Sequence, residues 1–218
     1  MFARDCIETA IPFIRLEDKI HYVLDLMNEY KTDRLAVVNN EQYIAVVSEN
    51  NLLEMDDELS IQEVIDHAAT DKIEENTHLF DVLKKCNDVG YYSLPLVSIE
   101  NNYIGITSAQ KILEQFTATS ALSASGGILI LEMDAKNYSL TEISRIVESN
   151  NAMILQTMLS SQPNHALRVS LKINKDDLKE IQATFERYSY NVIAVYHQSA
   201  FEFELQDRYD SLMRYLEV

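Results

Sequence analysis

The chain contains the stretch YIGITSAQKILE at residues 103–114, and an earlier stretch, YIAVVSENNLLE at residues 43–54, has the same pattern. Each stretch places a tyrosine before an apolar run, a serine after it (Ser48 or Ser108), and a Leu-Glu pair at its end. An apolar run followed by a serine is typical of a strand that leads into a helix. A repeat at this spacing indicates one supersecondary unit that occurs twice and buries its apolar face against its copy.

The surrounding segments repeat as well. Residues 35–38 and 43–47 are β-rich runs around a polar turn, which predicts a hairpin. A short apolar stretch at residues 11–16 and a helix after Asp18 precede this hairpin, and both helix and hairpin recur at an offset of 59 to 60 residues. Each copy therefore has the predicted order β-α-β-β-α, the first in residues 1–59 and the second in residues 60–116.

This repeated pattern resembles the closing strand and helix of CBS domains, which occur as tandem pairs. The resemblance covers about half of the chain. It implies an α+β fold in which two CBS repeats pack as a pair, with clefts between them that hold adenine-containing ligands. In CBS domains a serine or threonine helps to hold the phosphate, and an aspartate three residues later takes the ribose hydroxyls.

The chain keeps both hydroxyls of that motif, Ser48 and Ser108, but has Asn51 and Lys111 at the aspartate positions. Asparagine can still bond a ribose hydroxyl, whereas lysine cannot accept a hydrogen bond but can pair with a phosphate. The second copy, with both a hydroxyl and a cation, is therefore the expected working cleft. By resemblance, the base would rest against further apolar residues: Ile11 and Pro12, or Leu94 and Pro95. The alternative is that Lys111 is solvated and both clefts are degenerate.

The stretch TATSALSASGG at residues 117–127 has the composition of a flexible linker. After it, strands are predicted at residues 128–133, 152–160, 166–173 and 191–196. Helices are predicted after Ser139 and after Asn174, which can serve as a cap. The order βαββαβ predicts a ferredoxin-like sheet with both helices on one face. A terminal helix at residues 203–216 completes a domain that spans residues 128–218.

This second half resembles an ACT domain, and a CBS pair followed by an ACT domain resembles the acetoin-utilisation AcuB-like proteins. ACT domains commonly have a Pro-Gly-x-Leu turn after the first strand, where the glycine lets the backbone approach an amino-acid ligand. Here the turn reads Asn137, Tyr138, Ser139 and Leu140. Because Tyr138 replaces the glycine, its side chain would crowd that approach. Amino-acid sensing at this turn is therefore an alternative function.

Charge and composition narrow the classes of partner. The net charge is −17, and residues 1–116 hold 9 Lys and Arg against 22 Asp and Glu. Such an acidic surface repels nucleic acid and anionic membranes, so neither is an expected partner. The chain has no apolar run long enough to span a membrane and no signal-peptide pattern, which predicts a cytoplasmic protein. Cys86 falls on an apolar helix position and Cys6 lies far from it, so we expect neither a metal nor a redox site.

These observations predict a non-catalytic, ligand-sensing regulatory protein. With only four glycines, the chain has no P-loop, Rossmann or nucleophile-elbow pattern, and no cofactor is required. We expect a homodimer that binds an AMP- or ATP-type adenine ligand and signals to a partner protein that the sequence does not identify. The alternatives are an interaction or dimerisation scaffold with degenerate clefts, and an enzyme of unrecognised type.

Overall fold

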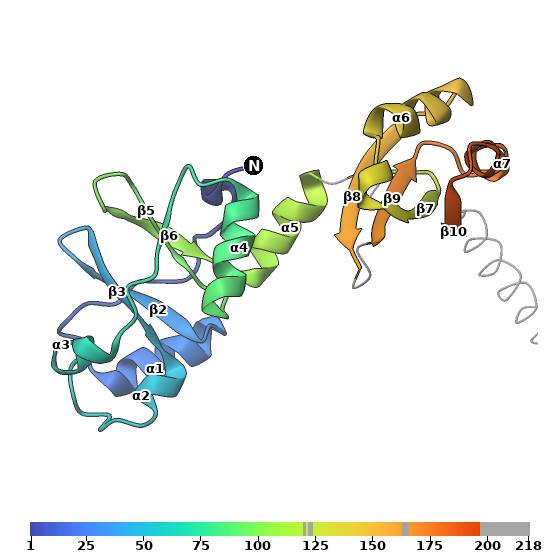
Figure 1. Ribbon diagram of the computed structural model, residues 1–218. Helices are drawn as coiled ribbons and strands as arrows, with labels where there is room; N and C mark the ends of the chain where they lie inside the picture. Colours follow the sequence, from blue (N-terminus) through green and yellow to red (C-terminus); the bar gives the residue numbers. More distant parts are fainter. Residues whose placement is uncertain (120, 122–123, 163–165, 197–218) are drawn as a thin grey trace, which may run out of the picture. The chain divides into compact units, whose positions relative to one another are not determined.

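The computed structural model describes residues 1–119, 121, 124–162 and 166–196 (Figure 1). The chain divides into two compact units, Met1–Thr119 and Ser120–Val218. The predicted terminal helix at residues 203–216 lies outside the described residues. The fold class is α+β, as the sequence predicts, with two repeats of similar element order followed by a ferredoxin-like sheet.

The first repeat is built around an antiparallel hairpin of two apolar strands. Asn40 and Glu41 in its turn have φ angles of 49° and 68°, the left-handed conformation that tight hairpin turns use. The helices before and after the hairpin cover one of its faces, and their apolar residues share one core with the strands. The elements are α1 (Ile20–Tyr30), β2 (Arg34–Asn39), β3 (Gln42–Ser48) and α2 (Glu49–Leu52), followed by α3 (Ile61–Val64) and η2 (Ile65–His67).

The strand predicted at residues 11–16 is reduced to a single bridge. Ile14 N donates to Ala36 O, and Val38 N donates to Ile14 O, each at 2.9 Å. Pro12 carries no N–H group that could extend this ladder toward the N-terminus. Only Ile14 therefore joins the hairpin, as a parallel neighbour of β2.

The second repeat has the same order of elements with a longer closing helix. Gly90 ends its first helix in the left-handed conformation, and Lys31 ends α1 in the same way. Its sheet has the strand order β1-β6-β5-β4, in which β4 and β5 are parallel and the other pairs are antiparallel. The elements are β4 (Ile73–Glu74), α4 (Leu79–Val89), β5 (Pro95–Val97), β6 (Tyr103–Thr107) and α5 (Ala109–Thr119), and η1 (Ala3–Cys6) leads into β1 (Ile7–Glu8) at the N-terminus.

Each repeat completes its sheet with the segment that precedes the other repeat. β1, which precedes the first repeat, pairs antiparallel with β6 of the second. Ala69, which precedes the second repeat, exchanges two backbone hydrogen bonds of 2.8 and 3.0 Å with Val46 of β3. Gly105 stands where the first copy has an alanine, because a Cβ atom there would lie 2.6 Å from Ile7 Cγ2. The pairing of β1 with β6 brings the segment after β1 beside the start of α5.

The two repeats meet at their hairpins. Tyr43 N donates to Asn101 O at 3.1 Å, and Tyr103 N donates to Glu41 O at 2.8 Å. Asn101 and Glu41 have the same φ angle of 68°. Val97 completes the small apolar cluster that both hairpins bury between them. Equivalent residues thus make reciprocal contacts, so an approximate two-fold relation connects the repeats.

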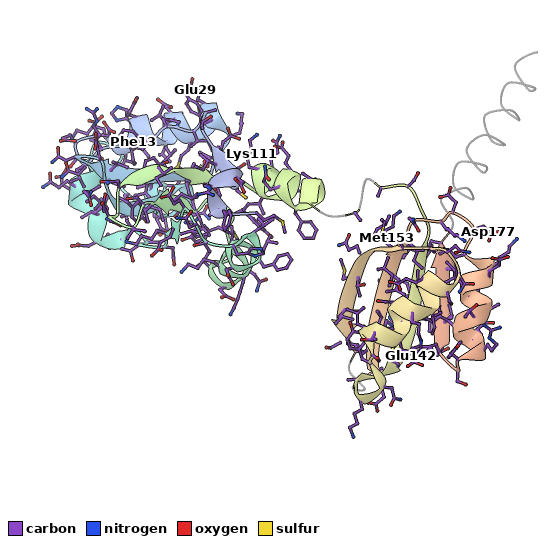
Figure 2. The ribbon with its side chains drawn as sticks, turned by 90° about the horizontal axis from the view of Figure 1, so that it is seen from above. Phe13, Glu29, Lys111, Glu142, Met153 and Asp177 are labelled. Atoms are coloured by element: carbon purple, nitrogen blue, oxygen red, sulfur yellow. The ribbon has the colours of Figure 1, made fainter. Side chains whose placement is uncertain are left out.

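The C-terminal unit is a four-stranded antiparallel sheet with two helices on the same side (Figure 2). The strand order is β10-β7-β9-β8. Leu129 and Leu131 of one central strand and Val169 and Leu171 of the other lie in one core with the buried residues of both helices, such as Phe185. The elements are β7 (Ile128–Asp134), η4 (Ala135–Asn137), α6 (Leu140–Ser149), β8 (Ile154–Ser161), β9 (Ala166–Ile173), α7 (Lys179–Arg187) and β10 (Asn191–Tyr196).

The sequence predicted that Asn174 caps α7, and this prediction is wrong. The helix begins at Lys179, with Leu178 at the N-cap position. Asn174 Oδ1 instead accepts a hydrogen bond of 2.7 Å from Met153 N, ahead of β8. The amide thus joins the end of β9 to the start of its neighbour, a long-range contact that competes with the local one.

Both ends of the region predicted as a linker belong to regular parts of the structure. α5 continues through Thr119, and Gly126 and Gly127 are buried. Gly127 N donates to Lys175 O at 2.7 Å, and Gly127 O accepts from Ile173 N at 2.9 Å. The two glycines therefore belong to the C-terminal unit, where small residues are required for close packing.

Replacing Gly126 with alanine is expected to destabilise the C-terminal unit strongly. Gly126 has a φ angle of 133°, and a Cβ atom there would lie 1.9 Å from the backbone oxygen of Ile173. Backbone strain alone costs on the order of 1–3 kcal/mol, and the clash adds to it. We expect a loss of about 3 kcal/mol or more in the free energy of unfolding, measured by urea denaturation followed by circular dichroism.

Gly90→Ala is the matched control for this experiment. Gly90 also has a positive φ angle, 80°, but no heavy atom lies within 4 Å of an added Cβ. The substitution should cost only about 1–2 kcal/mol, the usual penalty of the left-handed conformation. Equal losses for the two variants would contradict the proposed clash.

Candidate functional site

A cavity of about 630 Å³ opens between the two repeats of the N-terminal unit. We call it the open cleft. Its walls are the segment after β1, the loops that follow α1 and α4, and the start of α5, which the β1–β6 pairing brings together. The lining residues are Glu8, Ala10, Ile11, Tyr30, Lys31, Thr32, Asp33, Gly90, Tyr91, Tyr92, Ser93, Ser108, Ala109 and Gln110.

The start of α5 forms one wall of the open cleft. Ser108 Oγ accepts a hydrogen bond of 3.2 Å from Lys111 N, and the next two residues, Ala109 and Gln110, line the cavity. The first N–H groups of a helix have no partner within it and carry partial positive charge. This wall is therefore suited to a negatively charged or strongly polar ligand group.

The other walls combine aromatic surface with a few charges. Tyr92 is 51% exposed and Tyr30 is 37% exposed, so both rings offer contact area. Glu8 and Asp33 bring two carboxylates, and Lys31 brings one ammonium group. The cleft can therefore hold a flat apolar group against a tyrosine while carrying little positive charge of its own.

The structure separates the apolar residues that the sequence assigned to this ligand site. Ile11 lines the open cleft, whereas Pro12 beside it is half-buried and lies outside the lining. Leu94 is fully buried in the core of the second repeat, where its N–H group donates to Thr107 Oγ1 at 2.9 Å. Pro95 is buried as the first residue of β5. Ile11 is thus the member of this set that reaches the cleft.

Ser108 and Lys111, the polar pair predicted for the second copy, have different surroundings. Ser108 lines the open cleft, but Lys111 lies one turn into α5 and is absent from the lining (Figure 2). Lys111 Nζ donates to Glu114 at 3.1 Å, and this hydrogen bond and charge raise the pKa of Lys111. The ammonium group would have to leave Glu114 to contact a ligand.

Ser48 and Asn51, the corresponding pair of the first copy, line a cavity of only about 10 Å³. Ser48 Oγ accepts a hydrogen bond of 3.4 Å from Asn51 N, which is the same capping contact that Ser108 makes. Asn51 Nδ2 donates to the backbone oxygen of His67 at 3.3 Å. The first-copy motif is therefore occupied by contacts within the chain.

Sequence reasoning missed a polar cluster that lies between the repeats. Arg34 places its guanidinium carbon 3.7 Å from the centre of the Tyr91 ring. Tyr91 Oη donates to Asp71 Oδ2 at 2.9 Å, and Lys85 Nζ donates to Asp71 Oδ1 at 2.7 Å. We call these four residues the Arg34 cluster. The available signal was that Arg34 occupies the position of Ser93 in the second copy, a large residue in place of a small one.

The ionisation of the Arg34 cluster follows from these contacts. The hydrogen bond from Lys85 lowers the pKa of Asp71 below its usual range. Burial raises the pKa of Tyr91 to about 12, and the hydrogen bond to Asp71 acts in the same direction. At neutral pH the cluster therefore contains a carboxylate, a neutral phenol and two cations.

The three candidates in the ACT-like turn are not brought into one cavity. Asn137 lines a cavity of about 440 Å³ in the C-terminal unit, together with Glu142 and Tyr190. Tyr138 packs against the core of that unit, and Leu140, the first residue of α6, is 46% exposed. The turn provides one polar side chain to this cavity.

Comparisons with known proteins match the first repeat to a family model. The family model for the CBS domain matches residues 3–58. A CBS domain pair/ACT domain protein from Thermotoga maritima is 19% identical, with 54% of this chain and 98% of that chain covered and a TM-score of 0.49. The CBS domains of a transcriptional regulator from Streptococcus pneumoniae are 16% identical, with 52% of this chain and 98% of that chain covered and a TM-score of 0.47. CBSX2, solved in complex with AMP, is 19% identical, with 54% of this chain and 96% of that chain covered and a TM-score of 0.44. No curated protein matches the chain.

The family match extends from η1 past the end of α2 and includes the first repeat. This match supports the predicted CBS domain in the first repeat, and the second repeat has the same order of elements. The ACT-like and AcuB-like resemblances stay predictions. Within the described ranges, no helix has the length and apolar character needed to cross a membrane. Among the side chains that the structure describes, no group of three or more His, Cys, Asp or Glu is placed to hold a metal ion.

Asp71→Asn is expected to lower the stability of the N-terminal unit in a pH-dependent way. At pH 7 the loss should be about 1–2 kcal/mol, because the charge-assisted bond from Lys85 becomes a neutral one. Since the pKa of Asp71 is lower in the folded chain, its ionised form stabilises the fold above the unfolded-state pKa of about 3.9. That contribution disappears as the pH falls through the folded-state value.

The measurement is urea unfolding of both proteins at pH values from about 7 to about 3. The stability difference should shrink at the acidic end, where Asp71 becomes protonated. Asp88→Asn, which changes an exposed carboxylate on α4, is the control and should have little effect. A difference that stays constant with pH would show that the charge of Asp71 does not stabilise the cluster.

Proposed function

We propose that the N-terminal unit binds an adenine nucleotide in the open cleft and that the protein is a non-catalytic regulator of a partner protein. The observation that carries the proposal is the cleft itself, which lies at the junction of the two repeats and has a volume of about 630 Å³. Ligand pockets for small molecules typically have volumes of about 300–1,000 Å³. The CBS resemblance implies adenine-containing ligands at this junction.

The residues of the open cleft suggest how such a ligand is held. The base would lie against Ile11 and the exposed ring of Tyr92, since stacking on an aromatic side chain is favourable for every base. The phosphate would lie at Ser108 and the first N–H groups of α5. Lys111 would add attraction from one turn away rather than a direct contact, because Glu114 already holds its ammonium group.

The charges around the open cleft favour a ligand with few phosphates. Glu8 and Asp33 line the cleft together with a single ammonium group, that of Lys31. Residues 1–116 also carry a large excess of Asp and Glu. Each added phosphate increases the repulsion from these carboxylates. We therefore propose AMP, rather than ATP, as the better ligand.

A ligand in the open cleft contacts both repeats, so it can shift the balance between two packings of the repeats. A partner protein would respond to that shift. We propose a cytoplasmic protein without a nucleic-acid or membrane partner, because the acidic surface opposes both. Amino-acid sensing by the C-terminal unit stays a separate possibility that the cavity at Asn137 allows.

Ser108→Ala is expected to weaken AMP binding about tenfold, because one hydrogen bond to a charged group contributes roughly 1.5 kcal/mol. Ser48→Ala is the matched control, since Ser48 makes the same capping contact and lies outside the open cleft. Lys111→Ala should weaken binding only about twofold to threefold, as expected for a screened surface charge. Isothermal titration calorimetry with AMP, ATP and adenosine measures the affinity of each of the three variants.

Two results would count against the proposed function. Equal effects of Ser108→Ala and Ser48→Ala would mean that loss of the cap, rather than of a ligand contact, weakens binding. No heat with any of the three ligands, together with no shift in thermal unfolding, would favour an interaction scaffold with degenerate clefts.

We also propose that the chain forms a homodimer through exposed apolar residues on helices or at their ends. Leu53, Phe80 and Leu113 are 64%, 59% and 61% exposed. A stable interface buries about 1,600 Å² in total, which helix faces of this kind can supply. Sedimentation velocity should show a dimer of the 25.0 kDa chain at micromolar concentration, and Leu113→Asp should shift it toward monomer.

Ile99→Asp is the control for the dimer experiment. Ile99 is 83% exposed, but it lies in the loop between β5 and β6 rather than on a helix. It should leave the dimer intact. A monomeric wild-type chain would overturn the proposed dimer without affecting the ligand site.

A further inference from the structure

We propose that residues 203–216, which we call the terminal segment, bind the side of the C-terminal sheet that lies opposite α6 and α7. We call this side the free face. The terminal segment lies outside the described residues, so the argument rests on the free face and on the sequence of the segment. The inference does not depend on the ligand proposed for the open cleft, because the free face belongs to the other unit.

The strand register defines the free face as two neighbouring rows of side chains that cross all four strands. Directly opposed residues project to the same side of a sheet, and so do residues two apart along a strand. Leu129 and Leu171, which alternate with the residues of these rows, lie in the core beneath the helices. The first row is Tyr196, Ile128, Lys172 and Gln156, and the second is Ala194, Ile130, Ser170 and Met158.

The free face offers mainly apolar surface. Its long polar side chains already have partners in the same unit, since Lys172 Nζ donates to Gly126 O at 2.7 Å and Gln156 Oε1 accepts from Ala121 N at 3.1 Å. An antiparallel sheet with one side in water usually has polar residues on that side. An apolar side instead indicates a docking surface. The face bounds a cavity of about 320 Å³, lined by Ala121, Ile128, Ile130, Gln156, Met158, Ser170, Lys172 and Tyr196.

The terminal segment has an apolar stripe that fits such a surface. Its apolar residues follow one another at spacings of four, three and four positions, which places them on one side of the predicted helix. They are Leu205, Tyr209, Leu212 and Leu216. Charged and polar residues, such as Asp207, Asp210 and Ser211, fall between them. A helix of this length is marginal in water by itself, so it requires a surface against which the stripe is buried.

The chain leads directly from the free face to the terminal segment. Tyr196 is the last residue of β10, and it lines the cavity. Residues 197–202 follow it, and a connection of this length can extend about 20 Å. The predicted helix would be about 21 Å long, and β7 has a similar length of about 23 Å. The terminal segment can therefore turn back and lie along the strands.

The short connection favours the chain's own segment over a second copy of the protein. A group tethered by a short linker acts at an effective concentration of about 1 mM. A second chain at micromolar concentration competes with it at a large disadvantage. We therefore assign the free face to the terminal segment of the same chain.

The test is the oxidation of methionine to its sulfoxide by hydrogen peroxide in the full-length protein, followed by peptide mass spectrometry. Met158 lines the cavity and is 52% exposed, whereas Met153 is 55% exposed and lies outside the lining. Because oxidation depends on exposure, the two should react at similar rates if nothing covers the free face. A bound terminal segment should make Met158 react several-fold more slowly than Met153.

Variants of the terminal segment identify the cover. Leu205→Asp and Leu212→Asp each put a charge into the apolar stripe and should bring the rate of Met158 close to that of Met153. Ser211→Asp adds the same charge between stripe positions, on the polar side of the predicted helix, and should leave Met158 protected. Circular dichroism checks that each variant is folded. If the aspartate variants do not fold, the milder Leu212→Ala should still remove part of the protection.

Each outcome decides the proposal. Equal rates for Met158 and Met153 in the wild-type chain would show that the free face is uncovered and would overturn it. Protection that persists in the leucine variants would assign the cover to another group and overturn it as well. Protection that is lost on dilution would assign the cover to a second copy. Protection that is independent of protein concentration and sensitive to Leu205 and Leu212, but not to Ser211, would support the proposal.

Discussion

Neither repeat of the N-terminal unit can complete its sheet alone. An unpaired strand edge exposes a row of N–H and C=O groups, which is unfavourable and invites aggregation. Here β1 covers the edge of β6, and Ala69 bridges to Val46 on β3, so each repeat is completed by the segment that precedes the other. The two repeats must therefore fold as one unit. The same pairing sets the segment after β1 against α5, so the position of the open cleft is a direct consequence of how the sheets are completed.

The backbone relation between the repeats is conserved where local rules require it, and the side chains diverge elsewhere. Lys31 and Gly90 both end helices in the left-handed conformation, and Glu41 and Asn101 share one φ angle in equivalent turns. Equivalent positions nevertheless carry different side chains, such as Ser93 in the second copy and Arg34 in the first. The side chains of the two copies can therefore differ without any change of fold.

The sequence predicts the elements well because their signals are local. Helical periodicity and the capping contacts of Ser60 and Ser139 mark helix starts, and alternating apolar runs mark the hairpins. The edge pairings are missed, because the partners of β1 lie about a hundred residues away and no local pattern encodes them. The same limit applies to the site. The motif places Ser108 at the cleft, but it cannot show that Glu114 takes the ammonium group of Lys111 or that Leu94 faces the core.

Tyr43 and Tyr103 occupy equivalent positions in the two copies, but their hydroxyl groups differ in hydrogen bonding. Tyr43 Oη donates to Asp71 O at 2.8 Å, whereas the buried hydroxyl of Tyr103 has no hydrogen-bond partner among the described residues. The rings of Tyr103 and Phe13 pack edge to face, with their centroids 5.7 Å apart. A buried hydroxyl without a partner costs about 1–3 kcal/mol. Asp71 thus ties Tyr43 to Tyr91 and Lys85, whereas the Tyr103 hydroxyl makes no such contact with any residue that the structure describes. Regions with fewer satisfied polar contacts open more readily. The side of the N-terminal unit around Tyr103 is therefore expected to open before the side around Asp71.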